Sequence, residues 1–147
     1  MLQKLFATGN DLTLTVVRLV LGILFFAHGA QLTLGWFGGY GYTASMHFFT
    51  HEFPAWLAFL AIMTQFLGSI GLIVGLLSRI AVIGIAIDML VAIFTVHIHV
   101  GFFMNWYGMQ KGEGYEYHLL VLALCLLIFV KGSGAASLDR VIYKERA

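Results

Sequence analysis

The stretch LTLTVVRLVLGILFFAHGAQLTL, residues 12–34, decides the fold, because it is a nearly unbroken apolar run with only two ionisable side chains, Arg18 and His28. At a rise of about 1.5 Å per residue, a helix of roughly 20 apolar residues crosses the ~30 Å hydrocarbon layer of a membrane. Backbone amides in lipid must find partners within their own segment, so such a run is a helix. Three more apolar runs follow, and we predict membrane spans at 12–34, 55–77, 80–103 and 113–131.

The composition excludes a soluble globule. Of the 147 residues, 61% are hydrophobic and only 10% are charged, which leaves too little polar surface for a chain of this size. We therefore predict one all-α integral membrane domain over residues 1–147, an antiparallel bundle of four membrane-spanning helices. The connection at Ser78 and Arg79 is so short that the second and third spans should be antiparallel neighbours. Gly71 and Gly75 form a GxxxG pair, which predicts close helix packing.

Basic residues predict the orientation. Seven of the eight fall at one end of the spans, and Lys111 is the exception; the seven are Lys4, Arg18, Arg79, Lys131, Arg140, Lys144 and Arg146. The positive-inside rule then places both termini in the cytoplasm and the loops 35–54 and 104–115 outside. The first run is too long for a cleavable signal, and no small-residue cleavage pattern follows it. Ser137 is expected to cap a short terminal helix that lies on anionic lipid.

Several function classes lack support. The net charge is +1 and the basic residues orient the chain in the membrane, so nucleic acid is not an expected partner. Cys125 is the single cysteine, which excludes an internal disulfide and a CxxC redox motif. The sequence has no nucleotide-binding loop and no flavin, haem or iron–sulfur motif. The lipid bilayer is the partner that the composition itself predicts.

Ionisable residues inside the spans are the strongest functional signal, because charge in lipid is costly. Arg18 and Asp88 lie at depths that differ by only about 3 Å, so we expect an ion pair between the first and third spans. This pair would lock two helices or take part in proton movement or ligand binding. Alternatively, Arg18 extends to the cytoplasmic interface and leaves Asp88 alone. Gln65, near the middle of the second span, needs a partner in the same interior.

A second polar group marks the outer ends of the spans, namely His28, His97, His99, Glu116 and His118. We expect these side chains to converge in one layer, although each histidine alone is also consistent with a hydrogen-bonded interfacial residue. Helical phase places His99 about 20° from Asp88 and turns His97 to the opposite side. Phase therefore favours His99 as the interior residue, unless the helix unwinds near Gly101.

The first outer loop contains a weak metal signal. His47 and His51 are four residues apart, so on a helix they share a face and can bind a divalent metal. No third ligand is fixed by spacing, and the surrounding phenylalanines indicate an interfacial amphipathic segment. His47 and His51 are therefore only weak candidates, and the pattern does not assign a metal site.

The order and spacing of several motifs resemble the DoxX family over nearly the whole chain. The motifs are Arg18-Leu19, Leu21-Gly22, Phe26, His28-Gly29, Phe53-Pro54, the region 65–75, residues 92–97, Gly101-Phe102-Phe103, residues 114–117, Gly132, and Ser137-Leu138-Asp139. The resemblance implies a four-helix protein of the bacterial inner membrane. It points to Arg18, His28, His97 and Glu116 as functional residues. It favours His97 over His99, and it places Gln65 where many members carry an acid.

The resemblance also implies redox work, because members are similar to the membrane subunit of a thiosulfate:quinone oxidoreductase. The leading hypothesis is therefore a subunit or accessory of a membrane oxidoreductase, with His97, Glu116 and His28 as catalytic candidates in an outer pocket that takes a quinone. A redox partner subunit and a homo-oligomer are the protein partners that this reading suggests. A proton-coupled permease that uses Arg18, Asp88 and Gln65 is one alternative. A structural or assembly subunit without catalysis is the other.

Overall fold

The computed structural model describes residues 5–145, and every regular element in that part of the chain is helical. The elements are α2 (Leu12–Leu34), η1 (Trp36–Gly38), α3 (Gly41–Thr50), α4 (Ala55–Met63), η2 (Thr64–Gly68), α5 (Ser69–Val74), α6 (Ser78–Thr95), η3 (His97–His99), α7 (Glu116–Lys131) and α8 (Leu138–Glu145). The expected all-α class is confirmed. Lys4 and Arg146, two of the residues that predict the orientation, lie outside the described residues.

The first span begins and ends where the sequence predicts. The Asp11 side chain caps α2 by accepting hydrogen bonds from the backbone amides of Thr13 and Leu14. At the other end, Gly35 adopts a left-handed conformation with φ of 72°, which is favourable for glycine and ends the helix. The apolar run between Asp11 and Gly35 is nearly unbroken, so hydropathy and backbone geometry give the same bounds for α2.

Three helical segments are long and apolar enough to cross a membrane: Leu12–Leu34, Ala55–Val74 and Ser78–Thr95. The second consists of α4, η2 and α5 in succession, and η2 is a single turn of π-helix. The predicted third span extended to residue 103 and is wrong at that end, because α6 ends at Thr95. There Val96 leaves helical geometry with φ of −123° and ψ of −61°.

The fourth predicted span is shorter than expected. Helix α7 has 16 residues, which correspond to about 24 Å at helical rise, less than the ~30 Å hydrocarbon thickness. Its outward side chains are nonetheless apolar, as for Leu120, which is 67% exposed. The crossing of the membrane by α7, and with it the N-in/C-in orientation, therefore stays a prediction.

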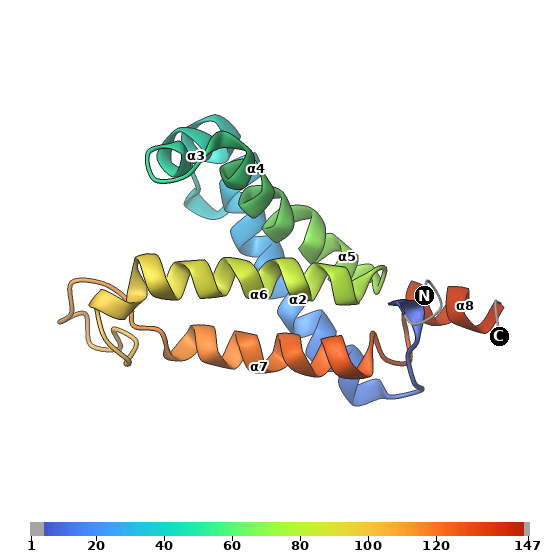
Figure 1. Ribbon diagram of the computed structural model, residues 1–147. Helices are drawn as coiled ribbons and strands as arrows, with labels where there is room; N and C mark the ends of the chain where they lie inside the picture. The colour runs from blue at the N-terminus through green and yellow to red at the C-terminus, as the bar shows by residue number, and fades with distance from the viewer. Residues whose placement is uncertain (1–4, 146–147) are drawn as a thin grey trace.

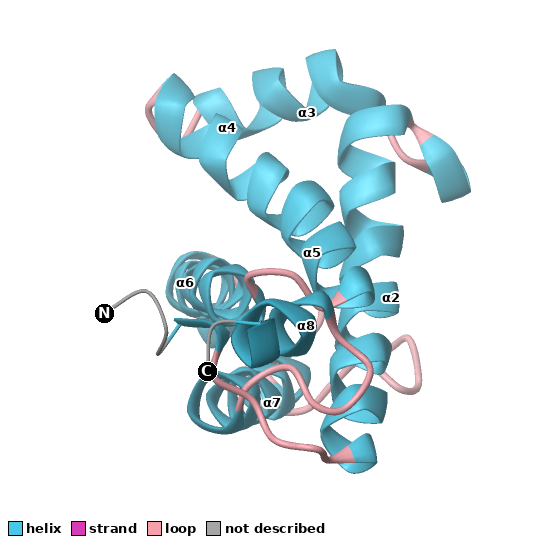
Figure 2. Ribbon diagram, turned by 90° about the vertical axis from the view of Figure 1, so that its right-hand side faces the viewer, coloured by secondary structure: helices cyan, strands magenta, loops and turns pink. Residues whose placement is uncertain are grey.

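The predicted antiparallel four-helix bundle is not confirmed, because the axes of the helices are not aligned with one another (Figure 1). Figure 1 shows α6 and α7 side by side, and α2 together with α4 and α5 crossing this pair at a wide angle. Figure 2 views α6 and α7 nearly end-on, while α2 runs across the picture. A single core joins the two pairs, and its buried members are Leu21, Phe25, Leu72, Val82, Ile85, Met89, Val121, Cys125 and Ile128. The described helices thus share one core although the ends of the two pairs diverge.

Glycines mark the closest helix approaches, but not at the predicted GxxxG pair. Gly75 ends α5 with φ of 72°, so it belongs to a turn rather than to a packing face. The tight contacts lie on either side of η2. A Cβ at Gly29 of α2 would be 2.6 Å from Phe66 Cα, and a Cβ at Gly84 of α6 would be 2.6 Å from Thr64 Cγ2. The π-helical turn is therefore held between two neighbouring helices.

The terminal helix agrees with the expectation from sequence. The Ser137 hydroxyl accepts a hydrogen bond from the Arg140 amide at 3.3 Å, as a capping residue does. Leu138 and Val141 are exposed apolar side chains on α8, whereas Asp139 is buried. The helix thus has an exposed apolar side and a second side anchored in the protein, and its position on anionic lipid stays a prediction.

Candidate functional site

Arg18 is buried at the end of the molecule where both chain termini lie, which we call the inner end, and it is bound by backbone carbonyls (Figure 1). Its Nη1 atom donates to the carbonyl oxygens of Leu72 at 2.5 Å and Ile73 at 3.1 Å, and Nη2 donates to Ala136 O at 2.6 Å. The predicted Arg18–Asp88 ion pair is wrong, since the charged group that acts on Arg18 is Asp139. Equal depth along two helices does not bring side chains together when the helices cross at a wide angle (Figure 1).

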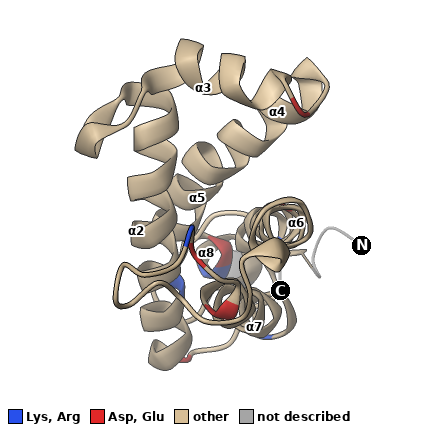
Figure 3. Cartoon of the chain, turned by 90° about the vertical axis from the view of Figure 1, so that its left-hand side faces the viewer, with Lys and Arg blue, Asp and Glu red and all other residues tan. Residues whose placement is uncertain are grey.

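Asp139 binds the turn that joins α5 to α6, at the start of α6. Its carboxylate accepts hydrogen bonds from the backbone amides of Leu77 at 2.7 Å and Ser78 at 3.1 Å, and from the Ser133 hydroxyl. Its own amide donates to Gly75 O at 2.8 Å. Figure 3 shows how sparse Lys, Arg, Asp and Glu are along the helices. We call the group of Arg18, Gly75, Ser133 and Asp139 the inner latch.

Arg79 extends the same construction to the start of the chain. Its Nε donates to Phe129 O at 2.8 Å, at the end of α7, and its Nη1 donates to Ala7 O at 2.6 Å and Leu5 O at 3.0 Å. A cation at the carbonyl end of a helix satisfies groups that have no partner within the helix. At this end of the molecule, hydrogen bonds thus connect α2, α5, α6, α7, α8 and the N-terminal segment.

Asp88 lies near the middle of α6 and interacts with Gln65 instead of Arg18. The side-chain hydrogen bond with Gln65 is its one electrostatic contact among the described residues. Its Oδ2 atom is shielded from solvent and has no hydrogen-bond partner. Gln65 belongs to η2, so the π-helical turn carries the amide that faces this carboxyl group.

The half of the molecule farther from the chain termini, which we call the outer half, contains a histidine pair. The ring centroids of His97 and His118 lie 4.1 Å apart, and His97 Nδ1 is 2.7 Å from the carbonyl oxygen of Glu113. Because a carbonyl only accepts, this contact assigns the proton to His97 Nδ1 and leaves Nε2 as an acceptor. His118 is buried, and its Nδ1 atom has no hydrogen-bond partner. The pair therefore offers an unsatisfied imidazole nitrogen in a shielded position.

The loop between η3 and α7 is folded by its own hydrogen bonds and contacts the histidine pair through the Glu113 carbonyl. Trp106 Nε1 donates to Glu116 Oε1 at 2.9 Å, and the Asn105 amide donates to Glu113 Oε2 at 2.7 Å. Gly114 lies against the carbonyl of Phe102, where a Cβ would approach to 2.6 Å. Glu116 is thus fixed at the start of α7, close in sequence to His118, with one carboxylate oxygen bound by the indole.

The five outer groups do not all converge. His28 is exposed, and its one ring contact among the described residues is Phe25, at 6.3 Å between centroids. His99 is exposed as well, whereas His97 is half-buried. The phase argument for His99 is wrong because α6 ends at Thr95 and η3 follows with a different twist.

The loop histidines stand apart from this group. His47 on α3 and His51, the residue directly after α3, have ring centroids 4.7 Å apart, and both are exposed. Within residues 5–145, no three ligand side chains of His, Cys, Asp or Glu gather in a metal-binding arrangement. Two exposed histidines without further ligands do not build a zinc site.

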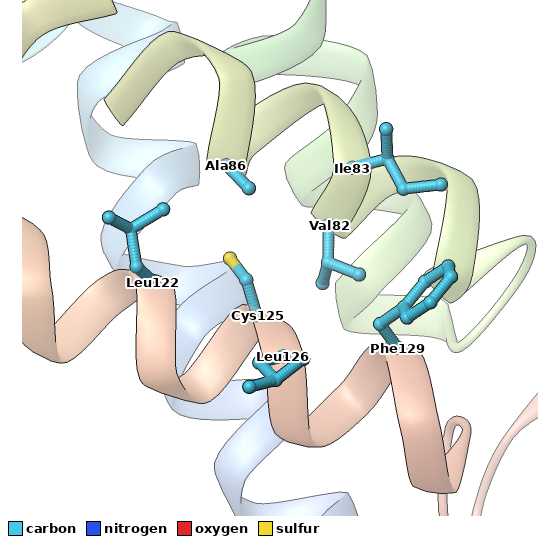
Figure 4. Close-up of a pocket in the computed structure, with 7 residues that line it drawn as sticks. All are labelled: Val82, Ile83, Ala86, Leu122, Cys125, Leu126 and Phe129. Atoms are coloured by element: carbon cyan, nitrogen blue, oxygen red, sulfur yellow. The ribbon is translucent and has the colours of Figure 1, made fainter. Parts of the chain in front are cut away.

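An apolar groove runs along the seam between α6 and α7. Figure 4 shows the Cys125 thiol pointing into it, and the volume is about 210 Å³. The lining residues are Val82, Ile83, Ala86, Leu122, Cys125, Leu126 and Phe129. Leu122 is one helical turn from His118 along α7, so the groove continues the same seam on which the histidine pair lies.

Sequence reasoning missed Asp139, Ser133 and Trp106 as parts of these sites. Asp139 follows the break after α7 and resembles an ordinary residue of a polar terminal helix. Its signal was its position two residues after the serine cap, in the Ser137-Leu138-Asp139 motif. Trp106 resembles an interfacial aromatic residue, and nothing in its spacing indicates a bond to Glu116.

The comparisons agree with the helical membrane character. The DoxX family model matches residues 13–98, more than half of the chain, and this part contains Arg18, His28, Gln65, Asp88 and His97. The match ends before α7, so the residues on α7 and α8 lie outside it. No curated protein and no solved structure matches the chain. The extent of the family match, together with the apolar helices that precede η3, establishes that the chain is a member of the DoxX family.

Proposed function

We propose that the protein is a subunit or accessory of a redox system in the bacterial inner membrane, and that its outer half binds a quinone or a similar carbonyl ligand. The observation that carries the proposal is the His97–His118 pair. A buried imidazole nitrogen without a partner costs free energy of about 1–3 kcal/mol, which a ligand carbonyl would recover by accepting a hydrogen bond.

The surrounding groups suit a lipid-soluble ligand of this kind. Reduction of a quinone takes up protons together with electrons, and a histidine beside a carboxylate is a suitable source of those protons. Glu116 would supply the carboxylate, and the Trp106 indole orients it by a hydrogen bond. The apolar groove on the same seam suits a hydrocarbon tail. Electrons would come from a partner subunit or from a second substrate, as in other systems whose protein part binds and orients the reactants.

The orientation belongs to the same proposal. With α7 as a fourth span and both termini in the cytoplasm, the histidine pair lies toward the outer side of the membrane. The inner latch then lies at the cytoplasmic side, where Lys131 and Arg140 meet anionic lipid. His28, on the diverging α2, is not needed for this pocket.

Binding of a short-chain ubiquinone to the protein in nanodiscs tests the proposal, with quenching of tryptophan fluorescence as the signal. His118→Asn should weaken binding about tenfold, which corresponds to about 1.4 kcal/mol, because it removes the imidazole donor. His99→Asn is the matched control, since His99 is exposed and should leave the affinity unchanged. Equal affinities for the wild type and both variants would exclude this pocket.

Proton-coupled transport is a second candidate, and Asp88 is the observation that favours it. A carboxyl group near the middle of a span, with one oxygen lacking a partner, is typical of proton relays in transporters. Reconstituted liposomes that move protons or a solute only with wild-type protein, and not with Asp88→Asn, would support this function instead.

A further inference from the structure

Asp88 is positioned inside the membrane rather than near a surface. It lies ten residues after the start of α6, about 15 Å along the axis of a helix that is long enough to span. The Oδ2 atom is shielded from solvent and accepts no hydrogen bond. Burial of a carboxyl group at this depth needs a specific explanation, because lipid provides no donors.

The partner of Asp88 is held in place from two sides. Gln65 is carried by η2, and the backbone of η2 lies against Gly29 of α2, where a Cβ would be 2.7 Å from Gln65 C. On the other side, Thr64 of η2 fills the space above Gly84 of α6. Neither contact leaves room for η2 to shift. A single π-helical turn within a helix often marks a functional site, and here it carries the one polar contact of Asp88.

None of the described cations neutralises Asp88. The elements packed around it carry few titratable groups: Arg18 and His28 on α2, none on α5, His97 and His99 on η3, and Glu116, Tyr117, His118, Cys125 and Lys131 on α7. Arg18 is bound to carbonyls at the inner latch. The group that interacts with Asp88 is the neutral amide of Gln65.

An ionised carboxylate in this position would be an uncompensated charge in a medium of low dielectric constant. Such a charge is removed most simply by a bound proton, since the neutral acid has a far smaller desolvation cost. We propose that Asp88 and Gln65 form a proton-binding site in the middle of the membrane, with Asp88 as a neutral carboxylic acid at neutral pH. The site is separate from the outer histidine pair and does not depend on the proposed ligand.

Dicyclohexylcarbodiimide, a lipid-soluble reagent, tests the site in the intact protein. The protonated acid adds its O–H across the reagent's C=N bond, and the product rearranges to an N-acylurea. The whole reagent is added and nothing leaves. We expect one adduct by intact mass spectrometry, mapped to Asp88 and absent from Asp88→Asn. Asp139 is an internal control, because the amides of Leu77 and Ser78 and the Ser133 hydroxyl already occupy its carboxylate oxygens, so it should stay unlabelled.

Infrared spectroscopy provides the decisive second measurement. The wild type should show the carbonyl stretch of a protonated carboxylic acid at neutral pH, and Asp88→Asn should lose that band. His118→Asn should retain both the band and the adduct, so failure of the ligand pocket and failure of the proton site are distinguishable. A wild-type spectrum that lacks this carboxylic-acid band, or a band that persists in Asp88→Asn, would overturn the proposal.

Discussion

Arg18 and Asp139 bind opposite sides of the turn that joins α5 to α6. The guanidinium takes the carbonyls of Leu72 and Ile73, where α5 ends, and the carboxylate takes the amides of Leu77 and Ser78, where α6 begins. Helix ends carry partial charges, negative at the C-terminus and positive at the N-terminus. Each side chain therefore stabilises the helix end of opposite sign, and the two charges also attract each other.

Loss of Asp139 should strongly destabilise the protein. Asp139→Ala leaves two backbone amides and the Arg18 charge without their partner in a buried site, which costs about 3–5 kcal/mol. The measurement is the thermal midpoint in mild detergent, followed by tryptophan fluorescence. Glu52→Ala, in an exposed turn, is the control and should shift the midpoint little. An Asp139→Ala midpoint equal to that of the control would contradict the role of the inner latch.

The two glycines around η2 should respond differently to enlargement. Gly29→Ala drives a methyl group into the backbone of Phe66, which cannot move aside. Gly84→Ala meets the methyl group of Thr64, a side chain that can be removed by substitution. We expect both variants to lose stability by about 1–3 kcal/mol, and Gly29→Ala to lose more.

A double-mutant cycle checks this geometry. Thr64→Ser removes the clashing methyl group, so the Gly84→Ala/Thr64→Ser protein should be more stable than the sum of the single variants predicts. The same Thr64→Ser change should not rescue Gly29→Ala. Additive effects in both pairs would show that Thr64 does not contact the Gly84 position.

Cys125 should act as a reporter of unfolding. Its thiol is 2% exposed and lies at the α6–α7 seam. A water-soluble maleimide should therefore label the native protein very slowly and the protein in denaturing detergent completely, as measured by intact mass. Rapid labelling of the native protein would indicate that the seam opens.

The membrane crossing of α7 has its own test. In a Cys125→Ser background, Gln110→Cys should react with an impermeant maleimide on spheroplasts, because the loop before α7 is predicted to face outward. Lys131→Cys should react only after the membrane is permeabilised, since it lies at the other end of α7. Labelling of both positions on intact spheroplasts would contradict the fourth span and the predicted orientation.

Sequence alone predicts the fold where lipid imposes strict requirements. The bounds of α2 follow from an apolar run, an Asp11 cap and a left-handed Gly35, all of which are local signals. The end of α6 at Thr95 was not predictable in this way, because the apolar run continues to Phe103 while the backbone leaves helical geometry. Hydropathy reports what lipid tolerates and does not report where the backbone turns.

The sites were less predictable because they depend on how helices cross. Arg18 and Asp88 match in depth, yet the wide crossing angle between helix pairs and the turn at Gly75 give Arg18 other partners. The outer His97 and His118 come together because α6 and α7 are antiparallel neighbours, whereas His28 lies on a helix that diverges from them (Figure 1). Proximity along the membrane normal thus identifies candidate residues and does not pair them.

Native mass spectrometry of the protein extracted in mild detergent tests the central claim most directly. The account predicts that the wild type retains a quinone or a redox partner, and that His118→Asn, purified in the same way, loses the quinone while His99→Asn retains it. Wild-type protein that carries neither, and that takes up no added ubiquinone, would contradict a ligand site at the His97–His118 pair.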